Sequence, residues 1–210
     1  MTLLVAAVTI VAIGDSTTAG TPGFKSPIES PPNGAGNIES QYSYWLMKTH
    51  ADWQVLNRGV NGERSDQIRA RFTRDVLAAK PTVVVIIAGV NDMYQGRAAQ
   101  VVERELEAMY DAARAAKIPV VAGTILPYNS AGADENARML AVNRWIRDYG
   151  ATHADVVFCD TRGAVSVPGQ PDGLVSSPDG LHPSPEGYKQ MADALEPAIR
   201  AALAKAQSLR

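Results

Sequence analysis

Four polar stretches, spread along the whole chain, contain the residue types that acyl transfer requires. They are Gly14-Asp15-Ser16-Thr17-Thr18, Asn57 to Gly62, Gly89-Val90-Asn91-Asp92 and Asp179-Gly180-Leu181-His182-Pro183. Acyl transfer needs a nucleophile, a base that takes its proton, a carboxylate that orients the base, and donors for the developing oxyanion. Each of these roles has a candidate in one of the four stretches.

The candidate catalytic residues are Ser16, His182 and Asp179. Ser16 would attack the carbonyl carbon and pass its hydroxyl proton to the imidazole of His182, while Asp179 would hold the other ring nitrogen. Only two residues separate Asp179 from His182, so both can lie on one loop. The pattern therefore predicts a Ser-His-Asp triad.

Three groups are candidate donors for the oxyanion: the backbone N–H groups of Ser16 and Gly62 and the side-chain amide of Asn91. A glycine lets the backbone approach a substrate closely, and an amide donates without carrying a charge. We expect Asp15 and Asp92 to orient backbone and loops rather than act as acids. Position in the chain suggests that Met93, Tyr94 and 127–129 line the acyl pocket.

The elements that must position these residues follow from the apolar runs. Strands are expected in the second half of Leu3 to Ile13, at Val55-Leu56, from Thr82 to Ala88, from Ile118 to Gly123 and from Asp155 to Cys159. Helical spacing between the runs predicts helices from Ser65 (Ile68, Phe72, Val76), over Val102 to Ala113, over Leu140 to Ile146 and from Ser184-Pro185 onwards (Tyr188, Met191, Leu195, Ile199).

Strands that alternate with helices predict an α/β fold, a three-layer α/β/α sandwich of flavodoxin-like type with a central parallel five-stranded sheet. Ligands of such sheets bind at the carboxyl ends of the strands, where the four polar stretches lie. We expect one domain over residues 1–210. The Pro- and Gly-rich segment 21–40 exceeds the usual loop length, which indicates a functional loop near the active site.

These residues resemble those of the SGNH, or GDSL-type, hydrolases. Gly14-Asp15-Ser16, Asn57 to Gly62, Gly89 to Asp92 and Asp179-x-x-His182 match the four blocks of that family in order. The resemblance implies a cofactor-independent serine esterase or lipase that works through an acyl-enzyme. Gly59 is a rival for the oxyanion position, but Gly62 lies five residues after Asn57, where the family has its glycine. Thr17 replaces the usual leucine, as in some carbohydrate acetylesterase branches.

Composition argues for small-molecule chemistry. Lys and Arg number 20 against 22 Asp and Glu, without a block of like charge, so neither nucleic acid nor stable membrane insertion is expected. The single cysteine, Cys159, excludes an internal disulfide and reads as a buried core residue. We expect a small-molecule ester substrate, no cofactor and no metal. Localisation is expected to be cytoplasmic, or secreted if a signal peptide precedes this sequence.

The leading interpretation is an esterase for short acyl esters of the acetyl type, on carbohydrates or on small aryl or alkyl alcohols. A thioesterase or lysophospholipase of the same family is an alternative. A second is a flavodoxin-like module that cradles a flavin phosphate on 16–21, which leaves Asp179 and His182 without a role. A third is a metal-dependent phosphodiesterase, although histidines at ligand spacing are lacking.

Overall fold

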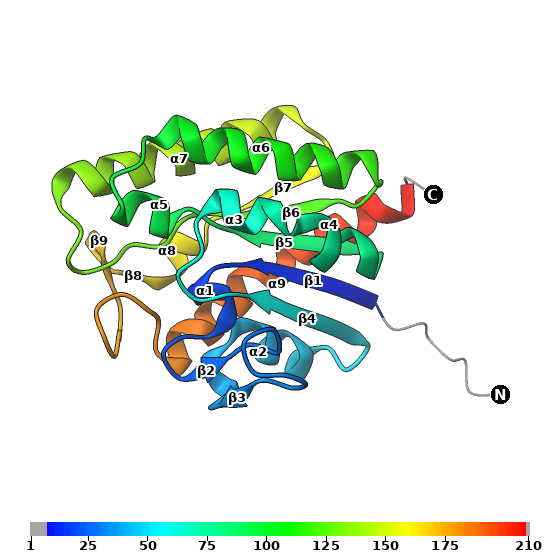
Figure 1. The fold of residues 1–210 in the computed structure, drawn as a ribbon, viewed down its shortest axis with the longest axis horizontal. Helices are drawn as coiled ribbons and strands as arrows, with labels where there is room; N and C mark the ends of the chain where they lie inside the picture. The colour runs from blue at the N-terminus through cyan, green and yellow to red at the C-terminus, as the bar shows by residue number, and fades with distance from the viewer. Residues whose placement is uncertain (1–7, 209–210) are drawn as a thin grey trace.

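The fold of residues 8–208, which a computed structural model describes, is built on a five-stranded parallel sheet (Figure 1). Its strands are β1 (Val8–Gly14), β4 (Trp53–Gly59), β5 (Val83–Ile87), β6 (Val120–Gly123) and β7 (Val156–Cys159), in the order β4-β1-β5-β6-β7. This order is flavodoxin-like. Strand β4 is added on one side of β1, whereas β5, β6 and β7 are added on the other, so the point where the strand order reverses lies between β1 and β5. The expected sheet is confirmed; the first half of the apolar run that starts at Leu3 lies outside the described residues.

Side chains of each central strand point alternately to the two faces of the sheet and pack into two separate hydrophobic clusters. In β1, Val11 and Ile13 pack with the helices on one face, whereas Ile10 and Ala12 pack with those on the other. The first face carries α3 (Ser65–Ala70), α4 (Phe72–Asp75), α6 (Ala99–Ala115) and α7 (Ala133–Thr152), and the second carries α2 (Tyr42–Thr49) and α9 (Pro185–Ser208) (Figure 1). Burial of both faces explains why the strands are continuously apolar.

Two helices begin where the site residues lie. α1 (Ser16–Ala19) is capped by Asp15, whose side chain accepts from the backbone N–H of Thr17 at 3.0 Å. α9 begins directly after Ser184, whose Oγ accepts from Gly187 N at 3.2 Å. Both starts therefore follow local capping chemistry.

The structure differs from the expected elements in detail. The helix predicted from Ser65 is divided at Arg71, whose ψ of 3° ends α3 before α4 begins. Short elements that the sequence did not indicate are β2 (Phe24–Lys25), β3 (Ala35–Gly36), η1 (Ile38–Ser40), η2 (Leu77–Ala79), α5 (Val90–Tyr94), α8 (Thr161–Val165), β8 (Ser166–Val167) and β9 (Gln170–Leu174). Such short pieces depend on tertiary contacts more than on local propensity.

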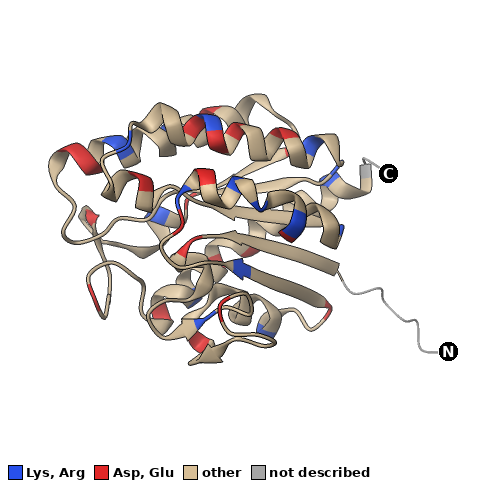
Figure 2. Ribbon diagram, viewed as in Figure 1, with Lys and Arg blue, Asp and Glu red and all other residues tan. Residues whose placement is uncertain are grey.

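Charged side chains of both signs are spread over the outer helices, while the strands are nearly free of them (Figure 2). α6 and α7, at the top of the view, show this mixture most clearly. Within residues 8–208, no helix has the length and apolar character needed to cross a membrane.

Candidate active site

Ser16 lies at the carboxyl end of β1, in the first turn of α1. Its side chain is buried, with 3% exposed. Gly14, two residues earlier, lies so close to Ile87 O and Thr18 that a Cβ there would overlap with them. The sheet and α1 are therefore in tight contact at this point, which holds the position of Ser16.

His182 reaches Ser16 from the other end of the chain. Its Nε2 lies 2.9 Å from Ser16 Oγ, and its Nδ1 lies 2.7 Å from Asp179 Oδ2. The second oxygen, Asp179 Oδ1, accepts from the backbone N–H groups of Leu181 and His182 at 2.9 and 2.8 Å. One carboxylate therefore shapes the loop and contacts the imidazole ring at the same time.

Hydrogen bonding sets the charge of Asp179. Burial alone would raise its pKa, but hydrogen bonds from the His182 ring and from the backbone N–H groups of His182 and Leu181 lower the pKa to about 2. Because this value lies below the unfolded-state value of 3.8, Asp179 contributes stability above about pH 4 and loses it as the pH falls towards 2. The carboxylate is thus charged at neutral pH.

The three candidate oxyanion donors all follow the carboxyl ends of strands: Ser16 follows β1, Gly62 follows β4 and Asn91 follows β5. The N–H of Ser16 belongs to the first turn of α1, where N–H groups have no partner within the helix. Asn91 lies in α5, after β5, and its Nδ2 donates to Glu63 O at 2.9 Å. Glu63 is the residue that follows Gly62, so Asn91 is tied to the turn that carries the glycine.

The two rival glycines have different surroundings. Gly59 ends β4, its N–H donates to Asn57 Oδ1 at 3.0 Å, and a Cβ there would overlap with the backbone of Ala19. Gly62 has a φ of +76°, and nothing lies within 4 Å of where its Cβ would be. Gly59 is thus needed for packing, whereas Gly62 lies in an open turn. This difference favours Gly62 as the donor.

A model of the GDSL-like lipase/acylhydrolase family matches residues 12–190, which is most of the chain. The chain belongs to this family. It is accordingly a carboxylic ester hydrolase, as the resemblance of the four blocks implied.

Solved structures of GDSL-family proteins have the same fold. One described as a G-D-S-L lipolytic protein, from Desulfitobacterium hafniense DCB-2, is 25% identical with a TM-score of 0.75, covering 91% of this chain and 99% of that one. A GDSL-like lipase from Bacteroides thetaiotaomicron VPI-5482 is 24% identical, with a TM-score of 0.74 and coverages of 92% and 88%. A catalytic mutant of an acetylxylan esterase from Geobacillus stearothermophilus is 20% identical, with a TM-score of 0.70 and coverages of 92% and 94%. A search of curated proteins found no match.

In this GDSL hydrolase, the aspartates beside Ser16 and Asn91 both organise backbone. Asp92 is fully buried and accepts from Ser65 N at 2.8 Å, from Ser65 Oγ at 2.9 Å and from Arg97 at 2.8 Å. Asp15 caps α1, and burial raises its pKa to about 7, with a further increase from the charge of Asp92 and opposing hydrogen bonds from Thr17. Both aspartates therefore support the loops that carry the candidate donors.

The residues expected to line the acyl pocket have different environments. Met93 is fully buried in the hydrophobic cluster on the α6 face, so it packs in the core and offers no exposed surface to a substrate. Tyr94 is 62% exposed, and its ring lies 5.9 Å from that of Tyr128. Asn129 donates through its backbone N–H to Gly180 O at 2.7 Å, on the loop of Asp179. Of these residues, Tyr94 presents the largest exposed apolar surface.

Burial argues against the flavin-phosphate alternative for this hydrolase. Thr17 and Thr18 are only 5% and 1% exposed, and Thr18 Oγ1 accepts from Tyr42 Oη at 3.1 Å. These hydroxyls are thus not presented to a ligand. Among residues 8–208, no three His, Cys, Asp or Glu side chains form a group that would hold a metal ion.

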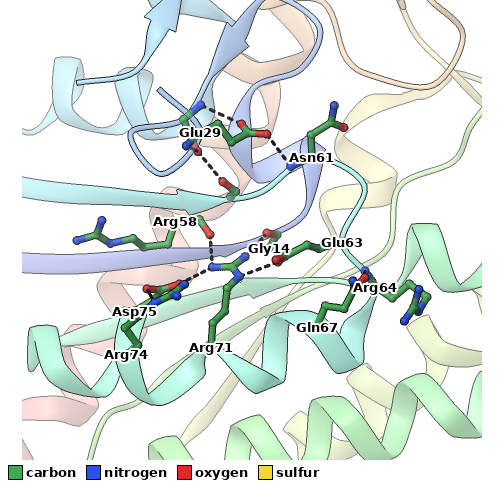
Figure 3. Close-up of polar contacts among 12 residues, drawn as sticks. Gly14, Glu29, Arg58, Asn61, Glu63, Arg64, Gln67, Arg71, Arg74 and Asp75 are labelled. Carbon is green, nitrogen blue, oxygen red and sulfur yellow. Dashed lines mark hydrogen bonds and ion pairs between the residues drawn. The ribbon is translucent and has the colours of Figure 1, made fainter. Parts of the chain in front are cut away.

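Sequence reasoning missed the residues that hold the turn of Gly62 (Figure 3). Ser26 Oγ donates to Gly59 O at 2.6 Å, and Glu29 Oε1 accepts from Asn61 N at 2.9 Å. On the other side of the turn, Arg71 donates to Glu63 at 2.6 Å. A serine and a glutamate in a Pro-rich loop, and an arginine on a helix, give no local signal for such roles, because their partners are distant in the sequence.

Proposed function

We propose that this GDSL hydrolase is a serine esterase that cleaves short acyl esters, of the acetyl type, through an acyl-enzyme. Ser16 is the nucleophile, His182 the general base and acid, and Asp179 the residue that orients His182. The observation that carries this proposal is the unbroken chain of contacts, 2.9 Å from Ser16 Oγ to His182 Nε2 and 2.7 Å from His182 Nδ1 to Asp179 Oδ2.

The reaction would proceed in two balanced halves. Ser16 Oγ bonds to the ester carbonyl carbon while its proton moves to His182 Nε2, and collapse of the tetrahedral intermediate expels the alcohol, which takes that proton. Water then attacks the acyl-enzyme, again with His182 as base, and Ser16 leaves with the proton. The negative oxygen of each intermediate would be bound by the N–H groups of Ser16 and Gly62 and by the amide of Asn91.

Two observations support a short acyl group on a carbohydrate or a small alcohol. Thr17 follows the nucleophile, as in some carbohydrate acetylesterase branches, and one structurally similar protein is described as an acetylxylan esterase. Tyr94 lies on α5 together with Asn91 and exposes an amphipathic ring on which the alcohol group can pack. The acetyl ester of a xylo-oligosaccharide and p-nitrophenyl acetate are therefore the substrates to test first.

The test compares two histidines that each contact a carboxylate. Ser16→Ala and His182→Ala should each lower kcat for p-nitrophenyl acetate by about 10⁴-fold or more. His50→Ala is the matched control, because His50 contacts Glu196 at 3.1 Å before β4, at the opposite end of the strands from Ser16. This control should retain the turnover of the wild type.

A panel of acetyl, butyryl and octanoyl esters, with acetyl thioesters as a separate arm, measures the substrate range. We expect kcat/KM to be highest for acetyl esters. Near-normal turnover by Ser16→Ala would overturn the mechanism, whereas a preference for octanoyl esters or thioesters would overturn only the substrate class.

A further inference from the structure

Arg71 is a buried arginine that connects β1, β4, α4 and the turn of Gly62 near the candidate active site. It is 6% exposed and lies between α3 and α4. Its guanidinium donates to Gly14 O at 2.9 Å and to Arg58 O at 2.8 Å, which are carbonyls near the carboxyl ends of β1 and β4 (Figure 3). Its other partners are the carboxylates of Glu63, at 2.6 Å, and Asp75, at 2.9 Å.

Of these partners, Glu63 is directly connected to the proposed oxyanion donors. It follows Gly62 in the chain, and its backbone carbonyl accepts from Asn91 Nδ2 at 2.9 Å. An amide NH₂ group carries two hydrogens, so the bond to Glu63 orients Asn91 and leaves its second hydrogen for a substrate. Two of the three proposed donors are therefore placed through Glu63.

The turn that carries Gly62 depends on polar contacts for its position. Nothing lies within 4 Å of where a Gly62 side chain would begin, so packing does not hold this residue. The turn is attached to the body by Val60 N, which donates to Gly14 O at 3.2 Å, by the Glu29 carboxylate on Asn61 N, and by the ion pair of Glu63 with Arg71. Between Gly62 and α3, this ion pair acts together with the bond from Asn91 Nδ2 to Glu63 O, and it is the contact there that ties the turn to the ends of β1 and β4.

We propose that the Arg71–Glu63 ion pair is a positioning unit for the oxyanion hole, which fixes the Gly62 N–H and the Asn91 amide relative to Ser16. The inference rests on the proposed function. Arg71 holds the ends of β1 and β4 by two nitrogens and Glu63 by a third, so one planar guanidinium group connects the sheet to the turn of Gly62. Such donors act on the transition state, so their displacement lowers kcat more than it changes KM.

The second carboxylate on Arg71 provides a matched control. Figure 3 shows Glu63 and Asp75 on opposite sides of the Arg71 guanidinium, and Asp75 belongs to α4, away from the turn of Gly62. Glu63→Gln and Asp75→Asn each replace one carboxylate partner of Arg71 by an amide of the same shape. A merely structural role predicts that both variants lose stability and that neither changes kcat selectively.

We expect Glu63→Gln to lower kcat for p-nitrophenyl acetate by about 10- to 100-fold, with KM within about twofold of the wild type. Asp75→Asn should lower Tm and keep kcat within about twofold. The affinity for an alkylboronic acid, whose tetrahedral serine adduct requires the oxyanion donors, should fall in Glu63→Gln by the same factor as kcat. Arg71→Lys keeps the positive charge but loses the planar guanidinium with its several N–H donors. Its losses of kcat and of boronic acid affinity should therefore resemble those of Glu63→Gln.

Wild-type kcat in Glu63→Gln, or an equal loss of kcat in Asp75→Asn, would overturn the positioning role. If Glu63→Gln does not fold, Glu63→Asp takes its place, since this substitution retains the charge but shortens the side chain by one methylene. A wild-type kcat in Glu63→Asp would also overturn the positioning role. Ser16→Ala separates the two proposals. If this variant remains active, the proposed function fails; if it is inactive while Glu63→Gln is normal, only the positioning role fails.

Discussion

The carboxyl of Asp15 illustrates how a single buried group next to Ser16 can govern the response of this GDSL hydrolase to pH. Asp15 is 1% exposed and caps α1, and burial raises its pKa to about 7. Since the unfolded-state value is 3.8, the folded state binds one more proton than the unfolded state between about pH 4 and pH 7. Its contribution to stability is complete below about pH 4 and is lost as the pH rises through 7.

Asp15→Asn should therefore remove one component of the pH dependence of stability. In the wild type, ionisation of Asp15 lowers the free energy of unfolding by up to about 4 kcal/mol at pH 8 relative to pH 4. The amide retains an acceptor for Thr17 N–H but does not ionise, so the variant should lose less stability over this range. Denaturant unfolding at pH 4, 6 and 8 measures the difference. The exposed Asp134→Asn serves as the control, and an identical pH dependence in Asp15→Asn and wild type would contradict this prediction.

Among individual residues, those of the four motifs could be predicted from the sequence, whereas the residues that hold the motif loops in place, such as Arg71, could not. Ser16, Asn91, Asp179 and His182 lie in short stretches with recognisable spacing, and the structure brings Ser16 and His182 within 2.9 Å. Their catalytic roles stay predictions until the kinetics are measured. Arg71 occupies a polar position of an apparently regular amphipathic helix, where an arginine usually faces solvent. Its burial follows from the division between α3 and α4, for which the sequence has no local signal.

At the scale of elements, the Pro- and Gly-rich segment 21–40 acts on the turn of Gly62 through two side chains. Ser26 is fully buried, and its hydroxyl donates to Gly59 O. Glu29 accepts from two backbone N–H groups, those of Ser26 and Asn61, at 3.1 and 2.9 Å. The segment also contains the β2–β3 hairpin. A functional loop was predicted here from its length; the contacts with Gly59 and Asn61 could not be, since they join residues about 30 positions apart.

Ser26→Ala should weaken this attachment. The substitution leaves the carbonyl of Gly59 without its donor in a buried position, which costs about 1–3 kcal/mol. We expect a lower Tm and faster amide hydrogen exchange over residues 59–63. Ser30→Ala, a half-exposed position in the same segment, is the control and should change stability by about 0.5 kcal/mol or less. Unchanged exchange over 59–63 in Ser26→Ala would argue against the attachment.

At the scale of the whole molecule, the docking of α9 on the sheet determines where His182 lies. α9 begins three residues after His182, and its apolar side chains, among them Leu195 and Ile199, are fully buried against the sheet. Tyr188 of the same helix donates to Thr21 O at 2.7 Å, just after α1. The apolar spacing of α9 made its existence and its buried face predictable, because a sheet covered on both sides requires such a helix.

Leu195→Ala should destabilise the fold without altering the chemistry. Truncation of this fully buried side chain leaves a cavity between α9 and the sheet and should lower the free energy of unfolding by about 2–5 kcal/mol. Well below the new Tm, kcat should remain close to that of the wild type. Lys189→Ala, on the exposed side of α9, should cause a much smaller change. A large loss of kcat in the folded Leu195→Ala protein would show that the helix and the site are coupled more tightly than the packing indicates.

The separation of Ser16 and His182 along the chain has a consequence during protein synthesis. The two side chains are 166 positions apart, and their contact forms only after every strand of the sheet has been made. A nascent polypeptide still attached to the ribosome, with residue 182 inside the exit tunnel, carries the serine but lacks its base. Ester hydrolysis should therefore begin only after residue 182 has left the exit tunnel and its segment has folded onto the sheet.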